Sequence, residues 1–209
     1  SNEIDDQVLR DFRTALNVAL IDRPLSDYSL KCLARHVGED LLRQKGFSKA
    51  DVDSVDETAL KAGSTIAEIS CESYKQAIRN VPNQMALGFM PFNTNDGLAD
   101  VKWQEHYAYV LGLFDTSPIF ETRTPDLWAA FAAVETDTNK KWISDFQRAL
   151  GNVPRLAVSG SDAHRFTGEP GNNDRRGYGD YPSGKATWIK ANPTFEGLKQ
   201  AIKEPAKRS

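Results

Sequence analysis

The apolar residues in the first part of the chain recur at the spacing of an amphipathic helix. They are Val8, Phe12, Ala15, Leu16 and Ala19. Pro24 interrupts this pattern, and Ser29 then favours the N-cap of a second helix that ends at Gly46. A further short helix is expected over residues 51–62. We therefore predict that residues 1–63 form a helical segment, acting as an insertion or a lid.

From residue 64 onward, short apolar runs alternate with helical patterns. Residues 65–70 suit either a strand or part of a longer helix, because their apolar positions fit both periods. Strands are expected over residues 85–90, 118–122, 155–159 and 185–190, and helices over residues 72–80, 103–113, 125–131, 141–150 and 195–202. Such alternation is typical of a mostly parallel sheet with outer helices, as in a barrel or a doubly wound fold. The sequence thus predicts an α/β domain over residues 64–209.

Polar segments follow three of the predicted strands. These segments are Asn93–Asp96, Glu121–Thr124 and Asp162–Arg165. In parallel α/β folds, the residues that bind ligands and perform chemistry gather at the carboxyl ends of the strands. We therefore expect the three polar segments to meet at one edge of the sheet and to form the functional site there.

Asp162 and His164 are the strongest candidates for a functional pair. They stand two residues apart on an extended segment, so both side chains can point the same way. Gly160 permits a tight backbone path just before them. One oxygen and one nitrogen ligand suit zinc, manganese or iron, which makes the pair a candidate metal site with a catalytic role. The alternative is a strand-end turn in which Asp162 caps local amides and His164 is merely exposed.

Glu121 and several arginines could complete this site. Glu121 ends a predicted strand and could ligate a metal or orient a ligand; alternatively, it forms a salt bridge with Arg123 or Lys190 at the sheet rim. Arginine suits bidentate phosphate recognition. The candidate substrate-binding residues are Arg123, Arg165, Arg175 and Arg176. The alternative for the loop arginines is solvation beside the acidic residues Glu169, Asp174 and Asp180.

Composition narrows the function classes. The net charge of −3 argues against a surface that coats nucleic acid in general, although a local basic groove remains compatible with it. Cys32 and Cys71 fit no zinc or redox spacing. No apolar run reaches the length of a membrane span, so we expect a cytoplasmic protein without membrane contact. The four tryptophans are spread among the predicted elements and are expected in the core rather than as a base-stacking platform.

The segment from Arg155 to His164 resembles the last metal-binding motif of PHP (polymerase and histidinol phosphatase) domains. The segment from Gly184 to Leu198, and that from Asn83 to Gly97, resemble the PHP-like region at the front of TrlF-type proteins. Those proteins join this region to an AAA-like or SMC-like ATPase. The likeness extends over roughly residues 65–209.

This resemblance implies a distorted (β/α)7 barrel, here partial, that holds metal ions and hydrolyses phosphoesters. Asp162 and His164 would be metal ligands, and the metal would lower the pKa of a bound water. Nucleic acid or a nucleotide phosphate would be the substrate, with an ATPase domain in the same parent chain. The family's opening His-x-His motif is missing, and Met90 stands where a mid-barrel histidine usually precedes proline. We expect the opening motif upstream of Ser1.

Three interpretations follow. The first is a metal-dependent phosphoesterase or nuclease module of a larger protein, incomplete and weakly active or inactive as this chain. The second is a catalytically inactive PHP-like module that binds or regulates. The third is an unrelated α/β protein with a coincidental motif. His36 and His106 lie in helical patterns and are expected to pack or face solvent rather than bind metal.

Overall fold

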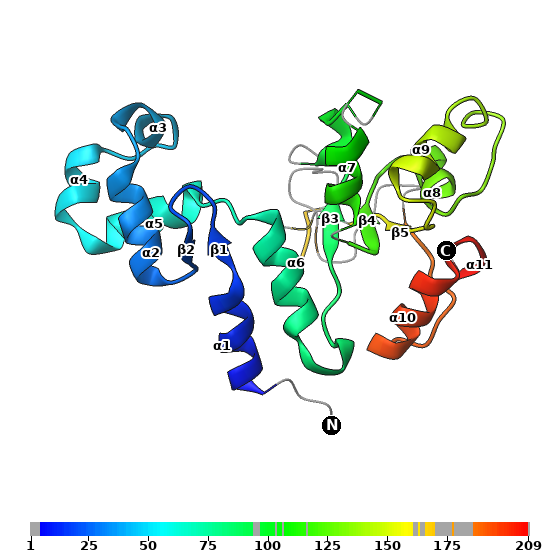
Figure 1. Ribbon diagram of the computed structural model, residues 1–209, viewed down its shortest axis with the longest axis horizontal. Helices are drawn as coiled ribbons and strands as arrows, with labels where there is room; N and C mark the ends of the chain where they lie inside the picture. Colours follow the sequence, from blue (N-terminus) through cyan, green and yellow to red (C-terminus); the bar gives the residue numbers. More distant parts are fainter. Residues whose placement is uncertain are drawn as a thin grey trace. The chain divides into compact units, whose positions relative to one another are not determined.

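The computed structural model describes residues 5–93, 97–102, 104–105, 107–115, 117–160, 163, 166–169, 177 and 186–208. The chain divides into two compact units, Ser1–Ala86 and Leu87–Ser209, whose elements are labelled in Figure 1. The boundary expected at residue 63 falls inside helix α5 (Asp56–Ile66), which belongs wholly to the first unit.

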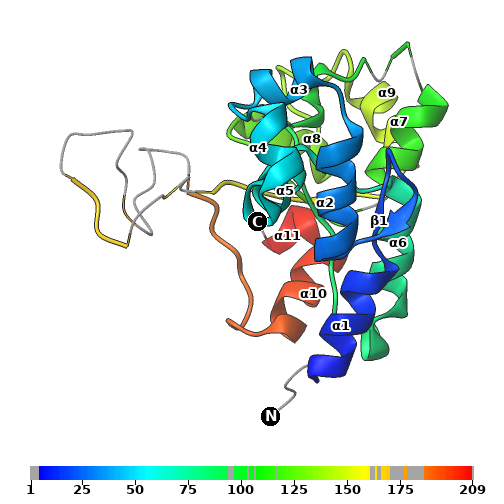
Figure 2. The same ribbon diagram turned by 90° about the vertical axis from the view of Figure 1, so that its left-hand side faces the viewer.

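The first unit is mainly helical, as the apolar spacing predicts. Its elements are α1 (Asp6–Ala15), β1 (Asn17–Val18), β2 (Arg23–Pro24), α2 (Asp27–His36), α3 (Glu39–Gln44), α4 (Lys49–Ser54), α5, α6 (Cys71–Asn80) and the 3-10 helix η1 (Pro82–Gln84). Helices α2 and α5 lie side by side (Figure 2). Leu33, Leu42 and Val52 are fully buried in the core that these helices share with their neighbours.

Two local predictions for this unit were wrong. The N-cap of α2 is Ser26, whose hydroxyl accepts the Ser29 N–H, while the buried Ser29 hydroxyl donates to the Pro24 carbonyl. The helix predicted to end at Gly46 is interrupted at Val37, where the backbone becomes extended before α3 begins. Gly46 does end α3, with a φ of 82° that suits glycine.

Residues 65–70, for which helix and strand both remained open, divide between the two. The end of α5 includes Ile66, and Ile69 forms an isolated antiparallel bridge with Val18. Val18 belongs to the short antiparallel pair β1–β2, which the sequence pattern did not predict. A strand of two residues is too short to show the alternation of apolar and polar positions, and for this reason the sequence pattern does not predict β1 and β2.

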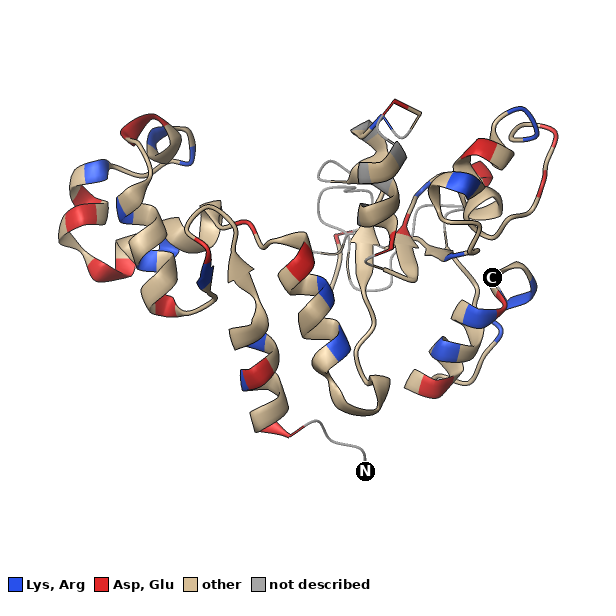
Figure 3. Ribbon diagram, in the orientation of Figure 1, with Lys and Arg blue, Asp and Glu red and all other residues tan. Residues whose placement is uncertain are grey.

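Acidic and basic residues both occur along the helices of the first unit (Figure 3). Asp56 connects α5 to α2 through two ion pairs and gives this unit an acid-sensitive contact. Its carboxylate accepts hydrogen bonds from Lys31 Nζ at 2.7 Å and Arg35 Nη2 at 2.6 Å. These two bonds, together with the positive charge of both partners, lower the pKa of Asp56 to about 2.

We predict that Asp56→Asn lowers the melting temperature of the first unit at pH 7 and much less at pH 2, where about half of the Asp56 carboxyls are protonated in the folded state. A carboxyl whose folded pKa is depressed stabilises the fold above its unfolded pKa of about 3.9. That contribution disappears as the pH falls from about 4 to about 2. Thermal melts of the wild type and the variant at several pH values measure the effect. Asp40→Asn, which removes a local pair with Arg43 inside α3, is the control; a constant difference at all pH values contradicts the prediction.

The second unit is a mixed α/β structure. Its elements are β3 (Phe89–Pro91), the 3-10 helix η2 (Leu98–Asp100), α7 (Tyr107–Phe114), β4 (Ile119–Glu121), α8 (Pro125–Phe131), α9 (Ile143–Ala149), β5 (Leu156–Val158), α10 (Phe195–Lys203) and α11 (Pro205–Arg208). The strands form a parallel sheet in the order β3–β4–β5. The predicted parallel sheet with outer helices is therefore confirmed, and the described residues form no closed barrel.

Successive side chains of a strand point to opposite faces of the sheet, so the two faces contribute to two different hydrophobic cores. Phe120 and Ala157 pack into a cluster of phenylalanines that α7, α8 and α9 complete. Ile119 and Leu156 pack on the opposite face with Ala201 of α10. Because both faces are covered where β4 and β5 begin, the first two residues of each of these strands are apolar and buried. This is why the two strands appear as short apolar runs in the sequence.

The strand predicted over residues 185–190 is not formed in its described part, residues 186–190. Its backbone bonds elsewhere: the Lys190 N–H donates to the Arg208 carbonyl at 2.7 Å, and Arg208 Nη1 donates to the Lys190 carbonyl. Towards β5, the segment uses a side chain, because the Ser159 N–H donates to Thr187 Oγ1 at 3.0 Å. The segment is thus held next to the end of β5 without joining the sheet.

Candidate functional site

The carboxyl ends of the three parallel strands lie level with one another. Pro91 is the register partner of Glu121, and Glu121 is the partner of Val158. The chain that leaves each strand therefore begins at the same edge of the sheet, as expected for the polar segments that follow β3, β4 and β5.

Asn93 joins the segments that leave β3 and β4. Its Nδ2 donates to Thr124 Oγ1 at 2.6 Å, and its Oδ1 accepts the Arg123 N–H at 2.8 Å. The amide side chain thus acts as both donor and acceptor and fixes the backbone that follows Glu121. Asn93 belongs to a predicted polar segment, and the structure assigns it a positioning role at the sheet edge.

Thr122 and Ser159 are buried polar residues at the same edge. The Thr122 N–H donates to the Val158 carbonyl at 2.9 Å, so the ladder between β4 and β5 continues one step beyond Glu121. The Thr122 carbonyl accepts the indole N–H of Trp128 at 2.9 Å. Ser159 bonds to Thr187 as described above. Sequence reasoning did not single out Ser159 or Thr187, because neither residue type signals a site by itself.

Glu121 is half-buried and lies on the sheet face that it shares with Ile119 and Val158. Among the described residues its carboxylate forms no ion pair, so the expected alternative of a salt bridge with Arg123 or Lys190 is not formed there. Arg123 is also half-buried, one residue beyond Thr122. Within the described part of the chain, the carboxylate of Glu121 is therefore left without an ion-pair partner at the carboxyl edge.

The remaining candidates lie outside the described residues: Asp162, His164, Arg165, Arg175 and Arg176. So does His106, whereas His36 lies at the end of α2 in the first unit. Within the described part of the chain, no group of three histidine, cysteine, aspartate or glutamate side chains could hold a metal. Of the described residues, Glu121 alone belongs to the predicted catalytic set, and it supplies a hard oxygen donor of the kind that divalent metals accept.

Arg155 marks the opposite end of β5. Burial lowers the pKa of its guanidinium, and the carboxylate of Asp115, 3.8 Å from Nη2, opposes that shift. Its Nε is buried without a hydrogen-bond partner. Since Arg155 precedes β5 and Ser159 follows it, this charge stands at the far edge of the sheet and takes no part in the candidate site.

No family model, no curated protein and no solved structure matches this chain. None of the described helices is both long enough and apolar enough to cross a membrane.

Proposed function

We propose that this chain is part of a PHP-like, metal-dependent phosphoesterase or nuclease module, with a partial (β/α)7-type barrel and a site at the carboxyl edge of β3, β4 and β5. One observation carries the proposal: Glu121 is in register with Val158. Only three residues separate Val158 from Asp162 in the sequence. We infer from this short separation in the sequence that the Asp162–His164 motif acts together with Glu121, whose carboxylate has no ion-pair partner among the described residues.

Each candidate residue has a role in this proposal. Asp162 and His164 would ligate a divalent zinc, manganese or iron ion, and Glu121 would ligate the same ion or orient a ligand to it. A bound metal would supply positive charge for a phosphoryl oxygen and lower the pKa of a coordinated water. Arg123, Arg165, Arg175 and Arg176 would bind the phosphates of a nucleic acid or nucleotide. An ATPase domain in the parent chain would couple the module to nucleic-acid processing in the cytoplasm.

A second candidate function is a catalytically inactive PHP-like module that binds or regulates. Met90 favours it, because this residue lies on β3, where the resemblance leads one to expect a histidine before Pro91. A thioether is a soft ligand and a poor substitute for imidazole at a hydrolytic metal. Both functions use the same sheet edge, and they differ in whether a bound metal is accompanied by hydrolysis.

Metal content and hydrolysis test the proposal together. The purified chain is loaded with manganese or zinc, the bound metal is measured by mass spectrometry, and hydrolysis of bis-p-nitrophenyl phosphate is followed. We expect Asp162→Ala and His164→Ala to abolish stoichiometric metal binding, and Glu121→Gln to weaken it by about 10- to 100-fold. His36→Ala, which changes a histidine of the first unit, is the matched control.

The outcomes separate the two functions. Metal binding that depends on His164, together with phosphodiester hydrolysis by the chain or its parent, supports the enzyme. The same metal binding without hydrolysis in either protein supports the inactive binding module. If no metal binds, or if His164→Ala and His36→Ala behave alike, the proposed metal site is refuted.

A further inference from the structure

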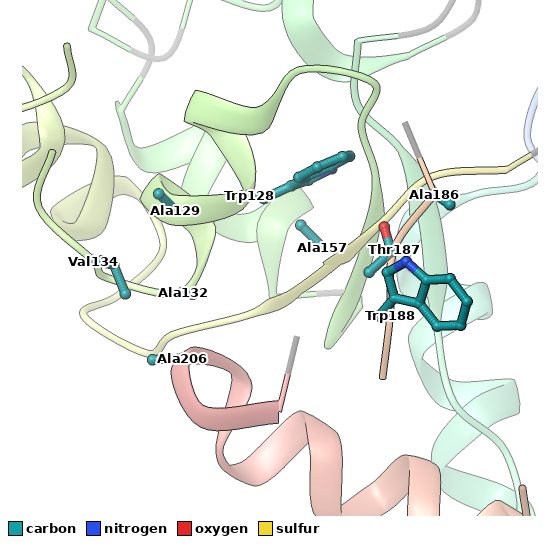
Figure 4. Close-up of a pocket in the computed structure, with 9 residues that line it drawn as sticks. All are labelled: Trp128, Ala129, Ala132, Val134, Ala157, Ala186, Thr187, Trp188 and Ala206. Atoms are coloured by element: carbon teal, nitrogen blue, oxygen red, sulfur yellow. The ribbon is translucent and has the colours of Figure 1, made fainter. Parts of the chain in front are cut away.

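A pocket of about 400 Å³ lies beside β5 in the second unit, within the size range of small-molecule sites (Figure 4). Its lining comes from α8 and the residues after it, from β5, from residues 186–188 and from α11. The lining residues are Trp128, Ala129, Ala132, Val134, Ala157, Ala186, Thr187, Trp188 and Ala206. None of these side chains carries a charge, and five of them are alanines that leave room for a guest.

The backbone of Ala157 gives this pocket a directional polar feature. In β5, the Leu156 N–H donates to the Pro118 carbonyl, and the Val158 carbonyl accepts the Thr122 N–H. These bonds direct Leu156 and Val158 toward β4. Because backbone groups alternate along a strand, the N–H and C=O of Ala157 point away from β4, toward the outer edge of β5.

At that outer edge, the N–H groups on either side of Ala157 are already satisfied. The Arg155 N–H donates to the Phe131 carbonyl at 2.8 Å, and the Ser159 N–H donates to Thr187 Oγ1 at 3.0 Å. Within the described structure, neither backbone group of Ala157 has a hydrogen-bond partner, although the residue is only 2% exposed. Buried backbone groups are nearly always paired, so this donor–acceptor pair indicates a missing partner at the pocket.

The two tryptophans define the shape that such a partner needs. The indole N–H of Trp128 is bonded to the Thr122 carbonyl, which fixes the orientation of its ring. Trp188 is 86% exposed, contrary to the expected core position. Both side chains reach the pocket (Figure 4). An exposed tryptophan beside an apolar pocket is suited to stacking on a flat ring, which would remove its apolar surface from water.

We propose that this pocket binds a purine base, with adenine as the best match. The Watson–Crick edge of adenine carries an amino donor next to a ring-nitrogen acceptor, and a backbone C=O next to an N–H complements that pair. The described lining residues carry no charge, so recognition rests on the neutral base, and any phosphate lies outside the part of the pocket that they form. This inference goes beyond the proposed hydrolytic function and does not depend on it, because none of the candidate metal ligands is among the described residues that line the pocket.

Titration calorimetry with adenosine as the probe tests this binding without a catalytic readout. We expect saturable binding, and about five- to tenfold weaker binding of N6,N6-dimethyladenosine, which lacks the amino donor for the Ala157 carbonyl. Trp188→Ala is expected to weaken adenosine binding about tenfold or more through lost stacking. Tyr28→Ala removes an exposed aromatic side chain of the first unit and serves as the matched control.

The Ala157 amide provides a second, independent readout. In protein labelled with 15N-alanine, the proton resonance of this amide should shift downfield when adenosine binds, because its N–H gains a hydrogen-bond acceptor. If this resonance does not move at saturating adenosine, the Ala157 N–H is not a donor to the ligand and the proposal is overturned. Equal binding of adenosine and its dimethyl analogue, or no saturable binding, also overturns it.

Discussion

Replacing Gly63 with alanine is expected to lower the free energy of unfolding of the first unit by roughly 3 kcal/mol. Gly63 lies in α5 and is buried against α2. A Cβ atom at this position would overlap the carbonyl oxygen of Leu30 and lie 2.5 Å from its carbonyl carbon. These are backbone atoms of a helix, so they cannot rotate aside as a flexible side chain would.

Two opposing effects determine the net change for Gly63→Ala. Alanine is favoured over glycine inside a helix by about 1 kcal/mol, which works in favour of the variant. Relief of the clash requires α2 and α5 to separate, and that loosens the contacts of buried Ala34, Ala59 and Ala62. The loss dominates because close helix approach depends on small residues along the whole interface, and overpacking costs several kcal/mol when the backbone must move.

All four tryptophans lie in the second unit, so tryptophan fluorescence does not follow unfolding of the first. Hydrogen exchange of peptides from α2 and α5, measured by mass spectrometry, follows the first unit instead. Gly38→Ala is the matched control: nothing lies within 4 Å of its added Cβ. As an N-cap position, Gly38 should change stability by no more than about 1 kcal/mol. Equal exchange rates in the two variants would show that α2 and α5 tolerate a wider separation than the packing indicates.

The sequence predicts the parallel sheet well because β4 and β5 begin with residues that are buried on both faces. Short apolar runs such as those of β4 and β5 are typical of that environment, and the polar residues that follow them mark the strand ends. Helix boundaries in the first unit are harder to predict, since Ser26 and Ser29 are both good N-cap residues. Only the tertiary contact with the Pro24 carbonyl places Ser29 inside the helix.

The candidate site follows from the sequence only in part. Glu121 and Asn93 could be singled out because they follow apolar runs, whereas the level register of Glu121 with Val158 is a tertiary property. The burial of Trp188 could not be predicted from its residue type. A tryptophan in an apolar run is expected in the core, yet this side chain is exposed. The segment that contains Trp188 forms backbone hydrogen bonds with α11 instead of joining the sheet, and the local sequence pattern does not indicate this pairing.

Phe131→Ala is the second large effect that we expect, a loss of about 3 to 5 kcal/mol from the stability of the second unit. Phe131 is fully buried in α8. Its ring stacks on Phe120 of β4 at 4.8 Å and makes edge contacts with Phe92 at 5.1 Å and Phe146 at 5.0 Å. Removing it leaves a cavity at the centre of the cluster and ends three aromatic contacts at once.

Urea unfolding followed by tryptophan fluorescence measures this loss in the second unit alone, because that unit holds every tryptophan of the chain. Phe131→Leu keeps most of the volume and should cost less than about 1.5 kcal/mol. Phe166→Ala, at a side chain that is 95% exposed, should change stability by less than about 0.5 kcal/mol. A loss below 1 kcal/mol for Phe131→Ala would mean that the cluster is not the main core of the unit.

Phe131→Ala also tests whether the phenylalanine cluster positions the carboxyl edge of the sheet. Phe131 holds β4 through its ring and β5 through its carbonyl, which accepts the Arg155 N–H. Because Glu121 and Ser159 end or follow those two strands, a shift of α8 moves the carboxyl edge as well. The proposed metal binding at Glu121 and the proposed adenosine binding at Ala157 should therefore both weaken in Phe131→Ala under conditions in which the unit remains folded. If both are retained at wild-type strength, the backbone ladder alone fixes the edge, and the phenylalanine cluster contributes stability without positioning the sites.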